Sequence, residues 1–502
     1  MIQQIDYFVI APPLVLAVVA GLVLLLDAFL PARPRTKTTL GLTTLAGVLT
    51  SLGFVIAQTA TGGGQTFCVP PNLTTEGTLC SFVADGFTLV FAGLVLVAAV
   101  VVVLMSMTEL ASGGIPVGEW YFLLLCTLVG AVSLPASRDL IMLVVALELV
   151  SLPVFALTAL KRYDGRSSEA AVKLFVVSVV STAIMLFGVS LLYGIAGTVY
   201  LSRLAAVFSG QIPAPGAALP ADQGLPAVVT VGVVLVVAGF AFKIAAVPFH
   251  SWAADVYQGA PIPVAALLSV ISKATGFAGL ILILVAALSG QAATWTPIIA
   301  IISALTMTVG NLLALRQRSA VRLLAWSSVA QSGYILAPLA VGTAGAIGAS
   351  TAYLVIYAAM NLGAFAVVML VSRTAARNEL DDYRGLVYRN RAAGIALAFC
   401  LVCLAGLPPG LAGLFAKVFV FREIIEGGTG WLALVMAVNT VIGLYYYAVW
   451  TARLFTPAEA AAPAAHRPSP AIWPAMGLAV AAAILFSIAP QLVLDMTTLS
   501  IR

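Results

Sequence analysis

Three lysines and one glutamate of this chain fall deep inside long apolar segments, where charged side chains are rare. Lys243 and Lys417 each lie beside a proline-containing stretch, in "AFKIAAVPFHSW" and "AGLPPGLAGLFAK", whereas Lys273 and Glu148 lie near the middle of apolar runs. An ionised lysine at the centre of a membrane helix costs about 2.5 to 3.5 kcal/mol, so each needs a partner or water. Burial disfavours the charged form of an amine and an approaching carboxylate favours it, so this array is suited to proton transfer.

Two further ionisable residues give weaker signals. Lys173 lies near one end of its apolar segment, one turn after Glu169. A local ion pair, or an amine that reaches the membrane surface, explains it as well as a functional role does. His250 follows the first proline break and could relay protons, although a structural histidine is nearly as common. We expect the three central lysines and Glu148 to form the site, with Lys173 and His250 as secondary candidates.

The segments that carry these residues have the composition and length of membrane spans. Of 502 residues, 62% are hydrophobic and 9% charged, against about 25% charged in a soluble domain. Apolar runs of roughly 20 residues recur, the length that a helix needs to cross about 30 Å of hydrocarbon. We expect an all-α polytopic membrane protein of about fourteen transmembrane helices. The expected spans are residues 9–30, 39–58, 84–107, 119–136, 139–160, 169–194, 226–248, 262–287, 293–315, 320–341, 346–372, 392–425, 430–455 and 470–493.

The basic residues in the loops predict the orientation of these spans, because basic loops stay in the cytoplasm. With both termini on the outer side, most arginines and lysines outside the spans fall on the inner side. These are Arg33, Arg35, Lys37, Lys161, Arg162, Arg166, Arg316, Arg318, Arg322, Arg373, Arg377, Arg384, Arg389, Arg391, Arg453 and Arg467, against Arg138, Arg203, Arg422 and Arg502 outside. The net charge of +5 is therefore a topology signal, and we expect no nucleic-acid partner.

The five cysteines separate by location. Cys68 and Cys80 flank a polar loop expected on the outer side, where a disulfide can form; two unbonded thiols fit the sequence equally well. Cys126, Cys400 and Cys403 fall inside spans, where packing is the expected role. The chain shows no dinucleotide fingerprint, no ferredoxin-like cysteine run and only two histidines, so we expect no redox cofactor or metal in it.

The proline breaks predict internal symmetry. Pro248 interrupts the seventh expected span, and Pro408 and Pro409 interrupt the twelfth, five spans later. A proline removes a backbone hydrogen bond, and unwound backbone at membrane depth survives only against protein or a water-filled cavity. Repeats of five helices would be inverted, an arrangement common in secondary transporters. We expect one membrane domain, 1–502, that contains inverted repeats at 119–287 and 293–455.

Several long stretches resemble the antiporter-like membrane subunits of bacterial respiratory complex I, the proton-pumping NADH:quinone oxidoreductase, and among them the subunit N family. The stretches are "GEWYFLLLCTLVGAVSLPASRDLIMLVVALELVSLPVFAL", "SSEAAVKLFVVSVVSTAIMLFGVSLLYG", "AFKIAAVPFHSWAADVYQGAPIPVAALLSVISKATGFA", "GNLLALRQRSAVRLLAWSSVAQSGYIL" and "LAGLPPGLAGLFAKVFVFREII". The resemblance implies fourteen helices, an inverted repeat and a hydrated axis for protons. It assigns proton translocation to Glu148, Lys243, Lys273 and Lys417. A lysine in the twelfth span favours subunit N over subunit M, and the short C-terminal end disfavours subunit L.

The resemblance also implies partners and a location. Subunits M and K would be the neighbours, with membrane lipid around them, in the bacterial inner membrane. FMN, iron–sulfur clusters and a quinone would be bound by other subunits of the complex. The alternatives are a subunit of a multisubunit Na⁺/H⁺ antiporter or membrane-bound hydrogenase, a transporter of a small solute, and a structural membrane scaffold.

The chain departs from the family pattern at a few positions. Gln331 stands where a histidine is usual in the tenth span, and Arg322 where a lysine often precedes "LAYSS". Ala416 and Ala254 replace a usual glycine and proline. Because a glutamine does not exchange protons near neutral pH, we expect water or another side chain to take the place of the histidine.

Overall fold

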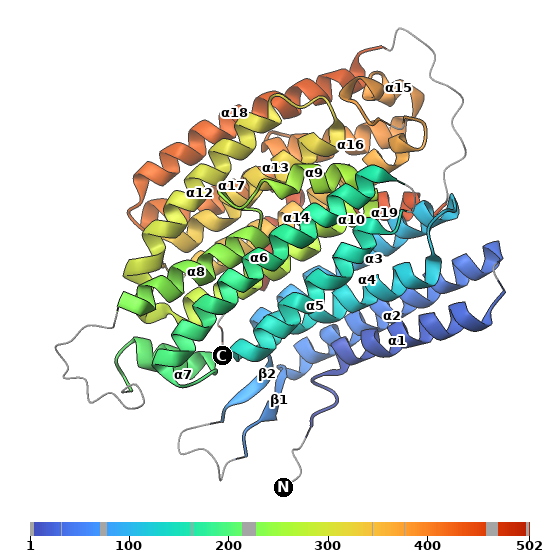
Figure 1. The fold of residues 1–502 in the computed structure, drawn as a ribbon. Coiled ribbons are helices and arrows are strands. Elements are labelled where there is room, and N and C mark those ends of the chain that lie inside the picture. The colour runs from blue at the N-terminus through green and yellow to red at the C-terminus, as the bar shows by residue number, and fades with distance from the viewer. Residues whose placement is uncertain are drawn as a thin grey trace.

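The long helices of this chain pack side by side in one bundle, with the N- and C-termini, the strands and α7 at the same end (Figure 1). The computed structural model describes residues 5–31, 33–70, 78–161, 164–212, 227–343, 345–375, 377–457, 470–497 and 501. Arg162, Arg467 and Arg502, which entered the orientation argument, lie outside the described residues.

Ten helical segments of the described chain are long and apolar enough to cross a membrane. This agrees with the polytopic helical architecture predicted from composition. The ten are α1 (Ala11–Phe29), α2 (Pro34–Thr61), α3 (Gly86–Ala111), α4 (Val117–Ser133) with the turn that follows it, α5 (Leu140–Ala159), α6 (Gly165–Ala196), the segment Ile262–Ala287, α12 (Ala292–Ala314) with the turn that precedes it, α14 (Ala346–Ser372) and α18 (Gly430–Phe455). Helix α13 (Ala320–Leu336) is shorter, at 17 residues. Short helices are α7 (Leu201–Phe208) and α15 (Leu386–Arg389).

Each range expected to span the membrane contains a described helix, and several of these helices are interrupted. The seventh range divides into α8 (Ala227–Lys243) and α9 (Trp252–Gly259), and the twelfth into α16 (Arg391–Ala405) and α17 (Leu411–Glu426). These are the two breaks that the prolines predict. A third bend, of 90°, separates α19 (Ile472–Ile488) from α20 (Pro490–Thr497). It was not predicted, although Pro490 begins the second piece.

The eighth range is one continuous span that contains wider helical turns. It runs through α10 (Ile262–Leu267), a π-helical segment (Leu268–Ser272), α11 (Lys273–Ile281) and a second π-helical segment (Leu282–Ala287). Such segments are rare and often occur at functional sites. The first ends immediately before Lys273, and nothing in the apolar pattern of the sequence predicts it.

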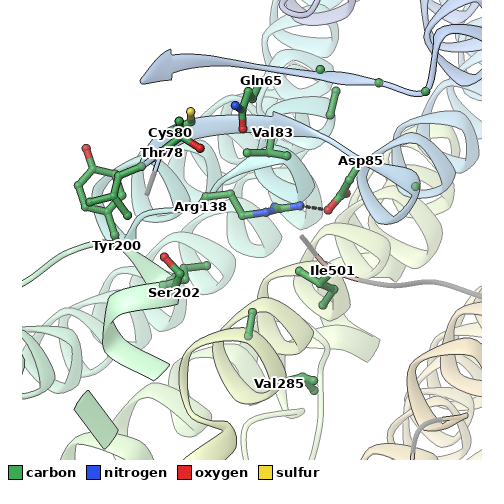
Figure 2. A pocket seen from close by; sticks show the side chains of 18 of the residues that line it. Gln65, Thr78, Cys80, Val83, Asp85, Arg138, Tyr200, Ser202, Val285 and Ile501 are labelled. Carbon is green, nitrogen blue, oxygen red and sulfur yellow. Dashed lines mark hydrogen bonds and ion pairs between the residues drawn. The ribbon is translucent and has the colours of Figure 1, made fainter. Parts of the chain in front are cut away.

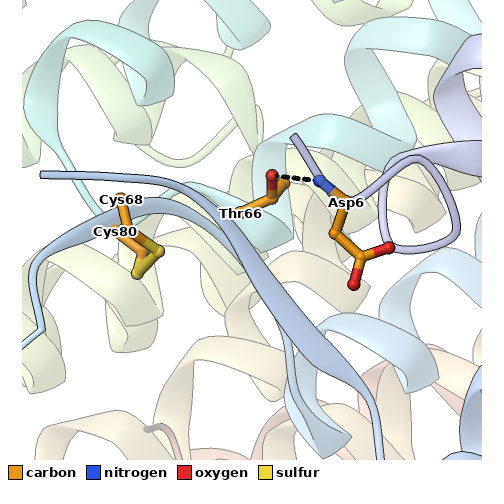
Figure 3. The surroundings of a disulfide bond; sticks show 4 residues. All are labelled: Asp6, Thr66, Cys68 and Cys80. Carbon is orange, nitrogen blue, oxygen red and sulfur yellow. Dashed lines mark hydrogen bonds between the residues drawn. A yellow bond between two sulfur atoms is a disulfide. The ribbon is translucent and has the colours of Figure 1, made fainter. Parts of the chain in front are cut away.

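A short β-hairpin at the end of the bundle that carries the termini departs from the predicted all-α fold. Strand β1 (Gly64–Cys68) pairs antiparallel with β2 (Cys80–Ala84), and Cys68 faces Cys80 across the ladder. The two cysteines form a disulfide in the structure (Figure 3). Thr66 Oγ1 of the same hairpin accepts a hydrogen bond of 3.0 Å from the backbone N–H of Asp6 (Figure 3). The hairpin therefore ties the start of the described chain to this end of the bundle.

A cavity of about 1020 Å³ lies beneath this hairpin (Figure 2). Its lining includes Arg138, whose guanidinium donates to Asp85 at 2.6 Å, and both side chains are almost fully buried. Asp85 also caps the N-terminus of α3 by accepting from Thr88 N–H. The lining contains none of the lysines expected to carry the chemistry, so the site lies deeper in the bundle.

Candidate functional site

Lys243 is the last residue of α8, at the edge of the first break. Its side chain is 8% exposed, and Nζ donates to Ser151 Oγ on α5 at 2.5 Å. Ser151 and Lys243 line a small internal cavity of about 10 Å³, enough for about one water molecule. The C-terminal end of a helix carries partial negative charge, which stabilises a nearby cation. The break therefore places the partial negative charge of a helix end beside the Lys243 amine, which a continuous helix would not do.

Glu148 lies on the same helix as Ser151, three residues earlier, and is half-buried. Its Oε1 accepts a hydrogen bond of 2.8 Å from Thr182 Oγ1 on α6. Within the described chain no ion pair of 4.0 Å or less joins Glu148 to Lys243. From the sequence, Glu148 and the buried lysines are expected to form one site in which the carboxylate favours the charged amine. The structure instead places the hydroxyl of Ser151 against the amine, one helical turn from the carboxylate.

Lys273 lies at the start of α11 and is 1% exposed. Its Nζ donates to the carbonyl oxygen of Ser328 and, at 2.6 Å, to Ser332 Oγ, both on α13. Ser332 Oγ in turn donates to the backbone oxygen of Ile244 at 2.7 Å, next to Lys243 in sequence. Ile244 belongs to the first break, so its carbonyl is available to a side chain. One serine therefore links the amine of Lys273 to the backbone beside Lys243.

Lys417 stands on α17, beyond the second break, and is 5% exposed. Its Nζ donates to the carbonyl oxygen of Ala405 at 2.7 Å and lies 3.5 Å from that of Leu404. These carbonyls belong to the C-terminal end of α16, which lacks intrahelical partners for them. The amine also lies 5.7 Å from the centre of the Tyr334 ring. The amines of Lys243 and Lys417 thus both lie beside the C-terminal end of a half-helix, α8 for Lys243 and α16 for Lys417.

A polar cluster, which was not predicted from the sequence, lies between Lys273 and Lys417. It contains buried hydroxyl and amide side chains from α12, α13, α14 and α18, and each hydroxyl or amide named here is hydrogen-bonded to another in the cluster. Its members are Asn311, Ser327, Ser328, Gln331, Tyr334, Tyr353, Tyr357, Asn439, Tyr446 and Tyr447. The signal in the sequence is weak, because tyrosine and serine are common inside membrane helices and only their shared depth distinguishes them.

The secondary candidates lie toward the end of the bundle opposite the hairpin. His250, in the first break, is half-buried, and its ring packs edge-on against Trp326, 5.6 Å away; its Nδ1 has no partner within the described chain. Lys173 is 44% exposed at its side chain and pairs with Glu169 at 2.7 Å and Asp255 at 3.1 Å. The ion-pair interpretation of Lys173 fits this geometry. The structure does not bring Lys173 together with the buried lysines.

Asp255 joins the charged residues around Lys173. Its carboxylate accepts from Lys173 on α6 and, at 2.8 Å, from Arg322 on α13, so it ties α9 to both helices. Partly exposed pairs contribute about 0.2–1 kcal/mol each. We expect Asp255→Asn to lower the thermal unfolding midpoint of the natively assembled protein slightly, and the difference to shrink at high salt as the charges are screened.

Asp381→Asn is the matched control for this experiment. Asp381 also pairs with two arginines, Arg384 at 3.2 Å and Arg453 at 3.3 Å, but it lies in the short 3-10 helix Leu380–Tyr383, away from the first break. If both variants lower the unfolding midpoint by the same salt-dependent amount, Asp255 contributes no more to stability at the broken helix than Asp381 contributes at its own position.

Comparison with known proteins places this geometry in a family. The family described as "NADH:quinone oxidoreductase/Mrp antiporter, TM" matches residues 137–443, which include all four central candidates. The chain is 48% identical to NADH-quinone oxidoreductase subunit N 2 of Streptomyces griseus, over 100% of this chain and 95% of that one. It is 45% identical to NADH-quinone oxidoreductase subunit N of Salinispora tropica, over 89% and 84% of the two chains.

Solved structures agree with this placement. A chain of respiratory complex I from Thermus thermophilus matches with a TM-score of 0.75 and 30% identity, over 96% of this chain and 98% of that one. A chain of the Mrp complex from Dietzia sp. matches with a TM-score of 0.82 over 98% and 97%, but at 20% identity it shows the fold alone. Membrane helices packed around buried lysines, two of them beside broken helices, define an antiporter-like membrane subunit. The chain belongs to the NADH:quinone oxidoreductase/Mrp antiporter family and, within it, to subunit N of the NADH-quinone oxidoreductases.

Proposed function

We propose that this subunit moves protons across the bacterial plasma membrane as part of an NADH:quinone oxidoreductase. The observation that carries the proposal is the surroundings of Lys243, Lys273 and Lys417. Each amine is almost fully buried, and within the described chain it is held by hydroxyl or carbonyl oxygens without an ion-pair partner. No fixed carboxylate commits such an amine to its charged form, so it is able to release a proton and take one up again.

The three amines form the line along which the proton would pass. Ser332 links Lys273 to the backbone beside Lys243, and the polar cluster extends from Lys273 toward Lys417. Glu148, one turn from Ser151, is the carboxylate whose approach or withdrawal would change the charge on Lys243. His250 is a secondary relay on the inner side, and Lys173 contributes there only as a surface charge.

The same proposal includes fourteen spans, both termini on the outer side, and inverted repeats at 119–287 and 293–455. Support comes from the helices found in every expected range and from the two breaks, each beside a lysine. The β-hairpin with its disulfide lies at the end expected outside, where disulfides persist.

Subunits M and K are the proposed neighbours, with lipid around the rest. Exposed apolar residues line α6 and α18, among them Phe175, Phe187, Leu434 and Val441, as a membrane-buried surface requires. FMN, iron–sulfur clusters and the quinone are proposed to be bound by other subunits, so this chain would be the non-redox, proton-translocating part of the enzyme.

The test starts from tagged protein purified from native membranes. We expect NADH-dependent quinone reductase activity to copurify and, in proteoliposomes, to pump protons. Lys273→Ala should assemble and lose most of the pumping, since no other amine among the described residues contacts Ser332. A lone, inactive subunit would refute the assembly, and full pumping by assembled Lys273→Ala would refute the translocation role.

A further inference from the structure

The proline that interrupts the seventh span leaves one backbone carbonyl without its helical partner. In a continuous helix the N–H of residue 248 would donate to the carbonyl oxygen of Ile244, but residue 248 is Pro248, which has no N–H. Ile244 is 1% exposed, and a buried carbonyl needs a hydrogen bond. Ser332 Oγ on α13 supplies it from 2.7 Å. The geometry of the first break therefore depends on where the single hydrogen of this hydroxyl points.

The Lys273 amine controls the direction of that hydrogen. Its Nζ donates to Ser332 Oγ at 2.6 Å and also to the carbonyl oxygen of Ser328. A charged ammonium has three hydrogens and no lone pair, so Ser332 Oγ can only accept from it. The Ser332 hydrogen then has two acceptors in reach, Ile244 O at 2.7 Å and Ser328 O at 3.2 Å, and Lys273 already occupies the second. The charged amine thus directs the hydrogen to Ile244.

The same amine acts differently once it has lost its proton. Neutral Nζ keeps a hydrogen for the Ser328 carbonyl and gains a lone pair that accepts. The Ser332 hydroxyl can then rotate and donate to Nζ, 2.6 Å away, with no covalent bond made or broken. Ile244 O would lose the hydrogen bond that replaces the one Pro248 cannot give.

We propose that Ser332 is a positioning residue that holds or releases the first break, and with it Lys243, according to whether Lys273 carries its proton. This inference rests on the proposed function, in which Lys273 gains and loses a proton. Lys243 directly precedes Ile244, and both pack against α11: a Cβ added at Gly276 would lie 2.9 Å from Ile244 Cγ2 and 3.1 Å from Lys243 Cγ. With so little free space, a shift of Ile244 also moves Lys243.

Hydrogen–deuterium exchange of the purified complex, followed by mass spectrometry of peptides across the break, tests this inference. The N–H groups of Ala245 and Ala246 are hydrogen-bonded to backbone oxygens, and that of Val247 donates to Thr306 Oγ1 at 2.9 Å. Their exchange therefore reports local opening. After correction for the intrinsic exchange rate, we expect opening in the wild type to increase about two- to tenfold from about pH 6 to about pH 9, because one net hydrogen bond is lost.

Three variants of the same complex separate the causes. Ser332→Ala removes the hydroxyl and Lys273→Met the titrating amine, so both should lose the pH dependence, and Ser332→Ala should keep the break open at every pH. Thr306→Val is the matched control. Thr306 also binds the break from a neighbouring helix, but among the described residues it contacts no lysine. Thr306→Val should raise exchange at Val247 at every pH and keep the wild-type pH dependence.

Other charged or titratable side chains lie on the elements around the break, and each is retained in Ser332→Ala. They are Glu148 on α5, Lys173 on α6, Lys243 on α8, His250, Asp255 and Tyr257 in and after the break, Arg322 and Tyr334 on α13, and Tyr357 on α14. If one of these groups causes the pH dependence, it persists in Ser332→Ala, and the proposal is refuted.

Pumping measurements keep this inference apart from the proposed function. Assembled Ser332→Ala should pump about two- to thirtyfold more slowly than the wild type, as changes that interrupt coupling between two sites do. Wild-type pumping by Ser332→Ala, or a wild-type break that opens equally at every pH, would refute the positioning role, and the function would stand if Lys273→Ala does not pump. If Lys273→Ala pumps normally, the proposed function itself fails, whatever the exchange shows.

Discussion

Lys243→Arg should abolish proton pumping almost as completely as Lys243→Ala, although arginine keeps the positive charge. Guanidinium does not release its proton at accessible pH, whereas an amine can. If Lys243 only balances charge, arginine should preserve function; if it must lose and regain a proton, arginine should fail. The Lys243 amine, held by one hydroxyl and without an ion pair in the described chain, favours the second result.

Arginine is also larger, and the cavity beside Lys243 holds only about 10 Å³. Lys243→Met is uncharged and close to lysine in size, so it removes the charge without adding volume. It should assemble and not pump. Lys173→Arg is the matched control, because Lys173 is 44% exposed and its two ion pairs tolerate a guanidinium. We expect it to pump normally. Wild-type pumping by assembled Lys243→Arg, measured in proteoliposomes, would remove Lys243 as a proton-releasing group.

Glu148→Gln complements this experiment. Glutamine can still accept from Thr182 Oγ1, so the helices should pack as before. Pumping should nevertheless fall, because the carboxylate that changes the charge on Lys243 is gone.

The polytopic helical architecture and two of the breaks could be predicted because hydrophobicity and proline act locally. Length and composition locate a helix in hydrocarbon, and Pro248, Pro408 and Pro409 remove hydrogen bonds wherever the helix carries them. The buried lysines could be found for a related reason: a charge inside an apolar run is costly in any fold.

The partners of those lysines could not be predicted in the same way. Which serine, carbonyl or tyrosine receives an amine depends on contacts between residues far apart in sequence, such as Lys243 with Ser151 or Lys273 with Ser332. Lys173 shows the same limit. Its local partner Glu169 was visible in the sequence, but the pairing with Asp255, 82 residues away, was not. The hairpin was missed because a short polar loop carries no hydrophobic pattern strong enough to indicate strands.

Gly413→Ala should sharply lower the amount of this subunit found in the complex. The glycine has no side chain, which lets the two half-helices α16 and α17 touch. Gly413 lies on α17, one turn before Lys417. A Cβ there would overlap the backbone oxygen of Cys403 on α16, closer than any real Cβ contact, and would also lie 3.5 Å from Met360 Sδ. A backbone oxygen cannot rotate aside, so α17 would have to move away from α16.

That movement would withdraw the Lys417 amine from the Ala405 carbonyl that it now reaches at 2.7 Å. Overpacking typically costs about 1–3 kcal/mol, occasionally more, and here a misplaced amine adds a functional loss. The measurements are the amount of subunit in the purified complex and the pumping rate per assembled complex. Gly477→Ala on α19 is the control, since a Cβ at that position meets nothing within 4 Å. If Gly413→Ala assembles and pumps as Gly477→Ala does, then contact between the two half-helices is not what places Lys417.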